Sequence, residues 1–154
     1  MPRHWLMKSE PETFSIDDLA RAKNGTTRWD GVRNYQARNF LRDDISLGDG
    51  VLFYHSSCEV PGIYGIAKVS SKPHPDDSQF DRKGEYFDPK ATRENPPWML
   101  VDVKLVKKTR PMPLEEMRSY RELAKMITLK RGNRLSVTPV TEAEWKFITG
   151  KLAK

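Results

Sequence analysis

The stretch Val51-Leu52-Phe53-Tyr54-His55 decides the fold of this chain, because it is a dense run of apolar and β-favouring residues. Such a run, bounded by turn residues, predicts a strand. After a short link that contains a Pro-Gly pair, residues 62–69 predict a second strand, so the two are expected to form a hairpin with a long loop. Gly65, in the middle of the second strand, indicates a β-bulge or a close approach of another backbone.

Towards the N-terminus, the pattern predicts one strand and two helices. Residues 4–8 are expected to form the first strand. Ser15 begins a capping-box pattern, with Asp18 at the third helical position, and this helix is expected to stop near Asn24-Gly25. Asn34 suits the N-cap of a second helix. The apolar face of that helix consists of Ala37, Phe40 and Leu41.

Towards the C-terminus, residues 73–97 are rich in proline and charge, which indicates a functional flap or a partly ordered loop. Residues 98–106 alternate as a strand does, and residues 112–126 predict one or two short helices. Residues 134–140 are expected to form a last strand, and a capping box at Thr141 begins a final helix. The inward-facing residues are expected to be Met99, Val101, Val103, Leu105, Trp145 and Ile148. About five strands with helices between and around them predict an α+β fold, a small mixed β-barrel.

The composition narrows the class of protein. A length of 154 residues with 37% apolar and 31% charged residues predicts one globular domain over residues 1–154. No run of about 18 apolar residues is present, so neither a membrane span nor a membrane partner is expected. A single cysteine, Cys58, excludes an internal disulfide and favours a cytoplasmic location. We expect a monomer. The net charge of +6 favours an anionic partner, most often nucleic acid.

Metal binding and catalysis have weak support in the sequence. The histidines His4, His55 and His74 and the one cysteine are too few and too scattered for a zinc site, so we expect no metal and no cofactor. His55, Ser56 and Cys58 lie close in sequence but lack a nucleophile elbow and a paired acid. We therefore expect no enzymatic activity; His55 and Glu10 are the candidates for a general acid or base if there is one.

Residues 29–39, with the sequence WDGVRNYQARN, combine an indole, a tyrosine, a glycine, two arginines and two asparagines. This mixture is typical of a surface that stacks on a flat ring, donates hydrogen bonds to its edge and meets a phosphate. Trp29 is the first candidate wall of a base pocket, although it can also be an ordinary core residue. Asn34 can read a base edge, cap the helix, or do both.

Other candidates stand where strands end or chains turn. Our hypothesis is an aromatic slot between Trp29 and Trp98 that holds one base, with polar side chains at its edge and basic side chains on phosphates. Turn chemistry, core packing and an ordinary surface turn are the structural alternatives for these positions. The remaining base-pocket candidates are Ser9, Asn34, Tyr54, His55 and Ser56, and the phosphate candidates are Lys8, Arg33, Arg131 and Arg134.

These motifs, in this order, resemble the EVE domain family of the PUA-like superfamily over nearly the whole chain. The resemblance rests on residues 5–11, 29–39, 51–56, 98 with 101–103, and 136–140. It implies a PUA-like mixed β-pseudo-barrel of about five to six strands with short surrounding helices. It also implies binding of RNA or DNA through a modified or flipped base, without a reaction. A nucleoside-like small-molecule binder or enzyme, and an interaction module that uses residues 73–97, remain alternatives.

Overall fold

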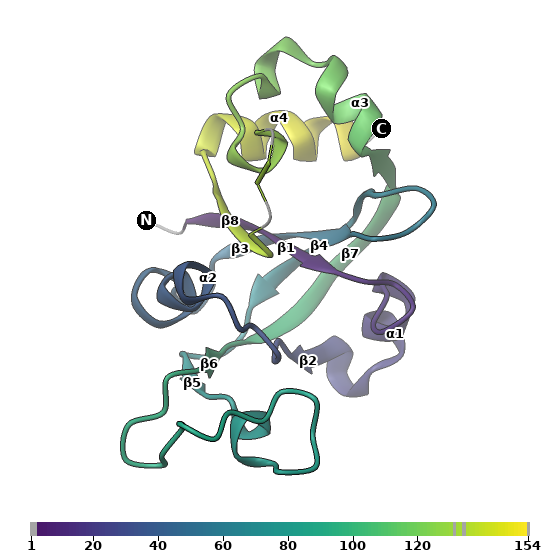
Figure 1. Cartoon of the computed structure of the whole chain (residues 1–154). Helices are drawn as coiled ribbons and strands as arrows, with labels where there is room; N and C mark the ends of the chain where they lie inside the picture. The colour runs from purple at the N-terminus through teal and green to yellow at the C-terminus, as the bar shows by residue number, and fades with distance from the viewer. Residues whose placement is uncertain (1–2, 131, 134, 154) are drawn as a thin grey trace.

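The computed structural model describes residues 3–130, 132–133 and 135–153, and its centre is a six-stranded mixed sheet (Figure 1). The strands follow one another in the order β2-β7-β4-β3-β1-β8, and β5 pairs with β6 in a separate small sheet. The strands are β1 His4–Ser9, β2 Thr26–Arg28, β3 Gly50–His55, β4 Gly62–Val69, β5 His74–Pro75, β6 Met99–Leu100, β7 Asp102–Pro113 and β8 Val137–Val140.

The pairing confirms the expected hairpin and the expected mixed fold. Strands β3 and β4 are antiparallel, while β1 runs parallel to β3 and antiparallel to β8. The expected bulge at Gly65 is confirmed, because the register between β4 and β7 shifts beside it. A Cβ atom there would lie 2.5 Å from Cδ1 of Ile16 and 3.2 Å from the backbone oxygen of Lys107. These irregularities bend the sheet, because a bulge increases the local twist.

Both faces of the sheet are buried. Successive residues of a strand point to opposite faces, so Trp5 and Phe53 enter one hydrophobic cluster while Leu6 and Leu52 enter the other. The first cluster also contains residues of the helical elements α1 Ile16–Arg21, α2 Tyr35–Asn39 and η2 Phe40–Asp44. The second contains residues of α3 Leu114–Ser119, η4 Arg121–Leu123 and α4 Glu142–Leu152. Figure 1 shows α3 and α4 at one end of the molecule and the small sheet at the other.

The helices are short, and their starts follow the sequence. The capping boxes at Ser15 and Thr141 are both formed, and the Oδ1 atom of Asn34 accepts hydrogen bonds from the N–H groups of Gln36 and Ala37. The helical elements are α1 Ile16–Arg21, η1 Lys23–Gly25, α2 Tyr35–Asn39, the π-helical turn η2 Phe40–Asp44, η3 Asp77–Phe80, α3 Leu114–Ser119, η4 Arg121–Leu123, η5 Ile127–Leu129 and α4 Glu142–Leu152. Among the described residues, none of these helices has the length and apolar character that a bilayer crossing requires.

Three expected boundaries were wrong. The expected strand 98–106 is divided, because β6 pairs with β5 and only β7 joins the main sheet. β7 then continues to Pro113, so helix α3 begins two residues later than expected. The last strand begins at Val137 rather than at residue 134, which lies outside the described residues.

The 73–97 segment is folded against the body of the protein and contains β5 and η3 (Figure 1, teal). Its anchors are Asp76 and Gln79, neither of which has any exposed surface. The amide of Gln79 donates to the carbonyl of Trp98 at 2.9 Å and accepts from its N–H at 3.1 Å. This segment therefore forms a fixed wall of the molecule, next to residues 29–34.

Candidate functional site

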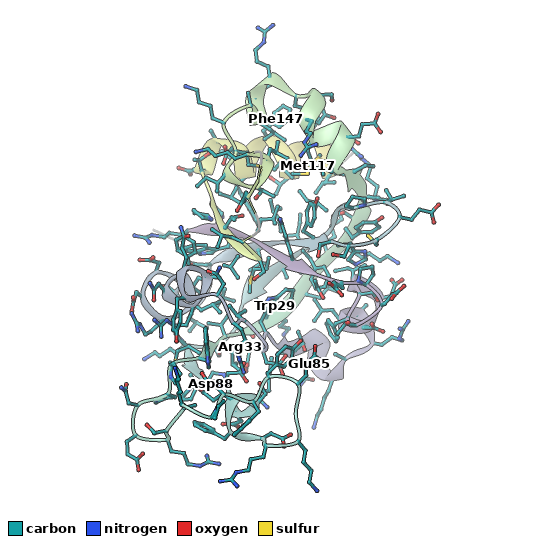
Figure 2. The ribbon with its side chains drawn as sticks, in the orientation of Figure 1. Trp29, Arg33, Glu85, Asp88, Met117 and Phe147 are labelled. Atoms are coloured by element: carbon teal, nitrogen blue, oxygen red, sulfur yellow. The ribbon has the colours of Figure 1, made fainter. Side chains whose placement is uncertain are left out.

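The main cavity measures about 760 Å³, which is within the range of small-molecule and base-sized sites. Its wall includes the end of β1, the two residues after β3, strand β2, residues 29–34 and the 73–97 segment. Its lining consists of Lys8, Ser9, Glu10, Thr13, Phe14, Thr27, Arg28, Trp29, Asp30, Gly31, Val32, Arg33, Asn34, Ser56, Ser57, Glu85, Tyr86, Asn133 and Ser136. Figure 2 shows Trp29 near the centre of the molecule, with Arg33 and with Glu85 of the 73–97 segment on the same side of it.

Trp29 lies both in the core and in the cavity wall. Its side chain is only 7% exposed and meets the ring of Phe53 edge-on, at 5.4 Å between centroids. Its backbone N–H donates to the carbonyl of Val101 at 2.9 Å, which ties this residue to the sheet. Trp29 is therefore a core residue that also lines the cavity, so the two interpretations do not exclude each other.

Tyr86, in the 73–97 segment, is a lining residue that the sequence analysis missed. Its ring lies directly against Gly31, where a Cβ atom would stand 2.6 Å from Cζ of Tyr86. Gly31 also has φ of +78°, a left-handed conformation that favours glycine. The glycine after Trp29-Asp30 was a usable signal, since it marks a place where another group can approach the backbone closely.

Arg33 is fully engaged inside the protein. Its Nε and Nη2 groups donate to the carbonyl of Tyr86, and Nη2 also reaches Oγ of Ser78. Its Nη1 group donates to the carbonyl of Val32 and to Oδ2 of Asp76, each at 3.0 Å. A guanidinium has five N–H donors, and in Arg33 all five are used within the protein. Arg33 therefore has no free donor for a phosphate.

Burial acts to raise the pKa of Asp76, but hydrogen bonds from Ser78, Gly31 and Arg33 outweigh it and hold the pKa below its usual value. The Arg33 guanidinium also lies 5.3 Å from the ring of Tyr86 and 5.2 Å from that of Trp98. The Arg33–Asp76 ion pair and the two aromatic rings therefore pack together beside the cavity wall.

Trp98 does not line the main cavity. Its indole stacks on Tyr35, with 4.7 Å between ring centroids, and its Nε1 donates to Oδ2 of Asp88 at 2.7 Å. A slot with Trp29 and Trp98 as its two walls is therefore not what this structure forms, because Trp98 supports the 73–97 segment instead. Tyr86 is the aromatic residue that this segment contributes to the lining.

Tyr54 and His55 also lie outside the lining. Tyr54 belongs to the hydrophobic cluster on the sheet face opposite Trp29. His55 caps helix α1, because its Nε2 accepts from the N–H of Ile16 at 3.1 Å while its ring stacks on Tyr64. Burial lowers the pKa of His55, against the opposing charge of Asp17. Both residues have structural partners that the sequence did not reveal.

Three of the expected base-edge residues do reach the cavity. The Oγ atom of Ser9 donates to the carbonyl of Phe14 at 2.6 Å and keeps its capacity to accept. Asn34 uses Oδ1 for the helix cap, and within the described residues its side-chain N–H groups have no acceptor. The backbone N–H of Ser56 donates to the carbonyl of Ser9 at 3.0 Å, which holds these two strand ends together.

Lys8 is the expected phosphate residue that remains a candidate in the lining. Burial lowers the pKa of Lys8, and its Nζ lies 5.6 Å from the ring centroid of Tyr54. It forms no ion pair with any described residue. Arg28 adds a second, exposed cation, whose Nη2 atom lies 3.6 Å from Oδ2 of Asp77. The expected residues Arg131 and Arg134 lie outside the described residues.

A second cavity of about 690 Å³ lies at the opposite end of β1, around Trp145. The rings of His4 and Trp145 stack on each other there, at 4.4 Å between centroids. Its polar lining is mostly charged, with Thr149 the one short neutral side chain among its described residues. The main cavity, with its serines, threonines and amides, suits the edge of a base better. Across the described ranges, no three His, Cys, Asp or Glu side chains are grouped as metal ligands would be.

A curled mixed sheet with short helices on both faces, and a polar and aromatic cavity where its strands end, defines a PUA-like module. The EVE domain model matches residues 3–151, and the chain belongs to the EVE domain family. Human thymocyte nuclear protein 1 is 44% identical, over 94% of this chain and 72% of its own length.

Solved structures agree with this assignment. A hypothetical protein from Leishmania major superposes with a TM-score of 0.92 at 48% identity, covering 99% of this chain and 96% of that one. The human THYN1 protein, solved in complex with DNA that contains 5-methylcytosine, superposes with a TM-score of 0.93 at 42% identity. That alignment covers 99% of this chain and 98% of the human one.

Proposed function

We propose that this chain is a non-enzymatic nucleic-acid-binding module that holds one modified or flipped base in the main cavity. DNA that carries 5-methylcytosine is the first candidate ligand. The observation that carries the proposal is the complex of the human relative with such DNA, since that relative matches this chain over nearly its full length.

The chemistry of the cavity supports this proposal. Trp29 and Tyr86 bring aromatic rings to the lining, and base stacking on an aromatic ring contributes about 1–3 kcal/mol. Extruding a base from a duplex costs a few kcal/mol, so stacking and edge contacts together can offset it. Ser9, Asn34 and Ser56 supply short polar groups for the edge of the base.

A binding titration tests the proposal. Fluorescence anisotropy would compare labelled duplexes with one central cytosine or 5-methylcytosine, at about 50 and 200 mM salt. We expect tighter binding of the methylated duplex and a steep loss of affinity at high salt, because phosphate contacts release counterions. Equal affinity for the two duplexes would refute recognition of the modified base.

Lys8 offers a sharper version of the same test. We expect Lys8→Ala to weaken binding to all sequences and to reduce the salt slope by about 1, as the loss of one phosphate contact does. Lys107→Ala is the matched control, because Lys107 is exposed on β7 and does not line the cavity. Equal effects of the two substitutions would mean that only net charge matters.

The alternative of a nucleoside-binding protein or enzyme has a separate signature. A free nucleoside that binds as tightly as the oligonucleotide, without salt dependence, would favour it. Turnover needs a general acid or base, and His55 is occupied as the cap of α1. Glu10 lines the cavity and is the remaining candidate for a general acid or base. Incubating the protein with 5-methylcytidine and analysing the products by chromatography would show whether any turnover occurs.

A further inference from the structure

A protein that binds 5-methylcytosine must reject thymine, and this inference rests on the function proposed above. Thymine carries the same methyl group at C5 and stacks in the same way, so aromatic walls do not separate the two bases. They differ at position 4, where cytosine has an amino donor and thymine has a carbonyl acceptor, and at N3, which accepts in cytosine and donates in thymine. A hydrogen-bond acceptor of the protein at position 4 therefore favours 5-methylcytosine over thymine.

Carboxylates supply such acceptors in the main cavity. The side chains of Glu10, Asp30 and Glu85 all belong to its lining. Tyr86 lines the same cavity. Burial raises the pKa of Tyr86, and the negative charges of Glu85, Asp30 and Glu10 raise it further, against the opposing charge of Arg33. Negative groups repel phosphates, so their position beside the aromatic rings suits a ligand edge that donates hydrogen bonds.

Asp30 is the best positioned of the three. The residue before it donates a backbone hydrogen bond to Val101, and the residue after it donates one to Oδ2 of the buried Asp76, at 2.8 Å. Its short side chain thus starts from a backbone that is fixed on both sides. Glu10 and Glu85 have one more rotatable bond, and each holds its carboxylate less firmly.

The Asp30 carboxylate forms no hydrogen bond or ion pair with a described side chain, although neighbouring atoms partly desolvate it. Desolvation raises the pKa of Asp30 and the negative charge of Asp76 adds to this effect, while the charges of Arg28 and Arg33 and the residue's own backbone N–H oppose it. Asp30 is exposed in the cavity lining and has no described side-chain partner. Its carboxylate is therefore open to a hydrogen-bond donor on a ligand.

We propose that Asp30 is the residue that distinguishes 5-methylcytosine from thymine. Its carboxylate accepts a hydrogen bond from the N4 amino group of the cytosine ring and repels the O4 atom of thymine. The side-chain N–H groups of Asn34, left over from the helix cap, complement the N3 and O2 acceptors of the same base.

The test measures the affinity of the protein for three labelled duplexes. Each carries 5-methylcytosine, cytosine or thymine opposite an abasic site, so that no base pair has to be broken before the base leaves the duplex. We expect the wild-type protein to prefer 5-methylcytosine to thymine by about tenfold or more, the effect of a good base-edge contact. Asp30→Asn should remove most of this preference, because an amide can turn to donate to O4. Circular dichroism and thermal unfolding confirm that the variant is folded.

Glu85→Gln is the matched control, since it removes the same charge from the same cavity. We expect it to raise the affinity for all three duplexes equally and to leave the ratio unchanged. If Asp30→Asn keeps the wild-type ratio, the assignment of Asp30 is wrong while the proposed function stands. If the wild-type protein does not prefer 5-methylcytosine to cytosine, the proposed function fails, and the assignment of Asp30 fails with it.

Discussion

Arg33 and Asp76 form an ion pair of 3.0 Å between Nη1 and Oδ2, and this pair joins the wall of the main cavity to the 73–97 segment. The Asp76 side chain has no exposed surface, while 21% of the Arg33 side chain is exposed. Because Arg33 also holds the carbonyl of Tyr86, the pair fixes the aromatic ring that this segment contributes to the cavity. We therefore expect stability and the proposed ligand binding to be coupled at this point.

Removal of Asp76 should strongly destabilise the protein. Asp76→Ala leaves Arg33 and the N–H of Gly31 without their acceptor, and breaking a buried pair typically costs about 3–5 kcal/mol. The neighbouring Asp77→Ala is the control, since its exposed pair with Arg28 belongs to a class that contributes about 0–1 kcal/mol. Urea denaturation measures both, and similar losses for the two variants would contradict the role of Asp76.

Gly31→Ala should damage binding more than a backbone penalty explains. The left-handed conformation alone costs about 1–2 kcal/mol for a residue with a side chain. The new Cβ would also displace the ring of Tyr86. Gly48→Ala is the control, because Gly48 has φ of +93° and no described atom within 4 Å of the added Cβ. We expect similar backbone penalties, but a loss of binding of about tenfold or more only for Gly31→Ala, as weakened stacking predicts. Equal binding by the two variants would show that Tyr86 is not part of the binding surface.

Trp98→Phe tests whether the second indole touches the ligand. The substitution keeps an aromatic ring against Tyr35 but removes the hydrogen bond from Nε1 to Asp88. We expect a lower melting temperature and unchanged affinity for the methylated duplex. Tyr86→Ala should instead weaken binding by about tenfold, the effect of losing one stacking partner. If Trp98→Phe weakened binding more than Tyr86→Ala does, the result would support a binding slot between Trp29 and Trp98.

Stability should fall below neutral pH because of His55. The neutral ring accepts a hydrogen bond from the N–H of Ile16, and burial lowers its pKa, so the folded state favours the neutral form. This contribution is fully present above the unfolded pKa of about 6.5 and is lost as the pH falls through the lower folded pKa. Thermal unfolding between about pH 5 and 8 should therefore show a steeper acid loss for the wild type than for His55→Gln. The contribution of His4, whose pKa burial also lowers, cancels in this comparison. Parallel profiles would rule out a role for His55.

The sequence predicted the parts of this fold that depend on near neighbours. The caps at Ser15, Asn34 and Thr141 form because each side chain reaches an N–H two or three residues away. The hairpin of β3 and β4 follows from a dense apolar run between turn residues, and the bulge follows from Gly65 in mid-strand. The same reasoning found Lys8, Ser9, Trp29, Asn34 and Ser56, which do line the cavity.

The site residues that sequence reasoning misplaced all depend on distant partners. Trp98 is held by Asp88 and Tyr35, and His55 is held by helix α1, from 39 residues away. Nothing in the sequence near Trp98 or His55 distinguishes these structural partners from a ligand. Tyr86 was missed for the converse reason, since it stands in a charged, proline-rich segment far from any strand.

The amino-acid sequence by itself determined the central hairpin, the starts of the capped helices and the segment that brings aromatic and amide groups together. These properties depend on residues within one turn or on the two-residue period of a strand. Only the tertiary structure decided that Arg33 faces Asp76 rather than solvent and that Tyr86 closes the cavity. Such contacts join segments more than 40 residues apart, and they are set by how the whole chain packs against its sheet.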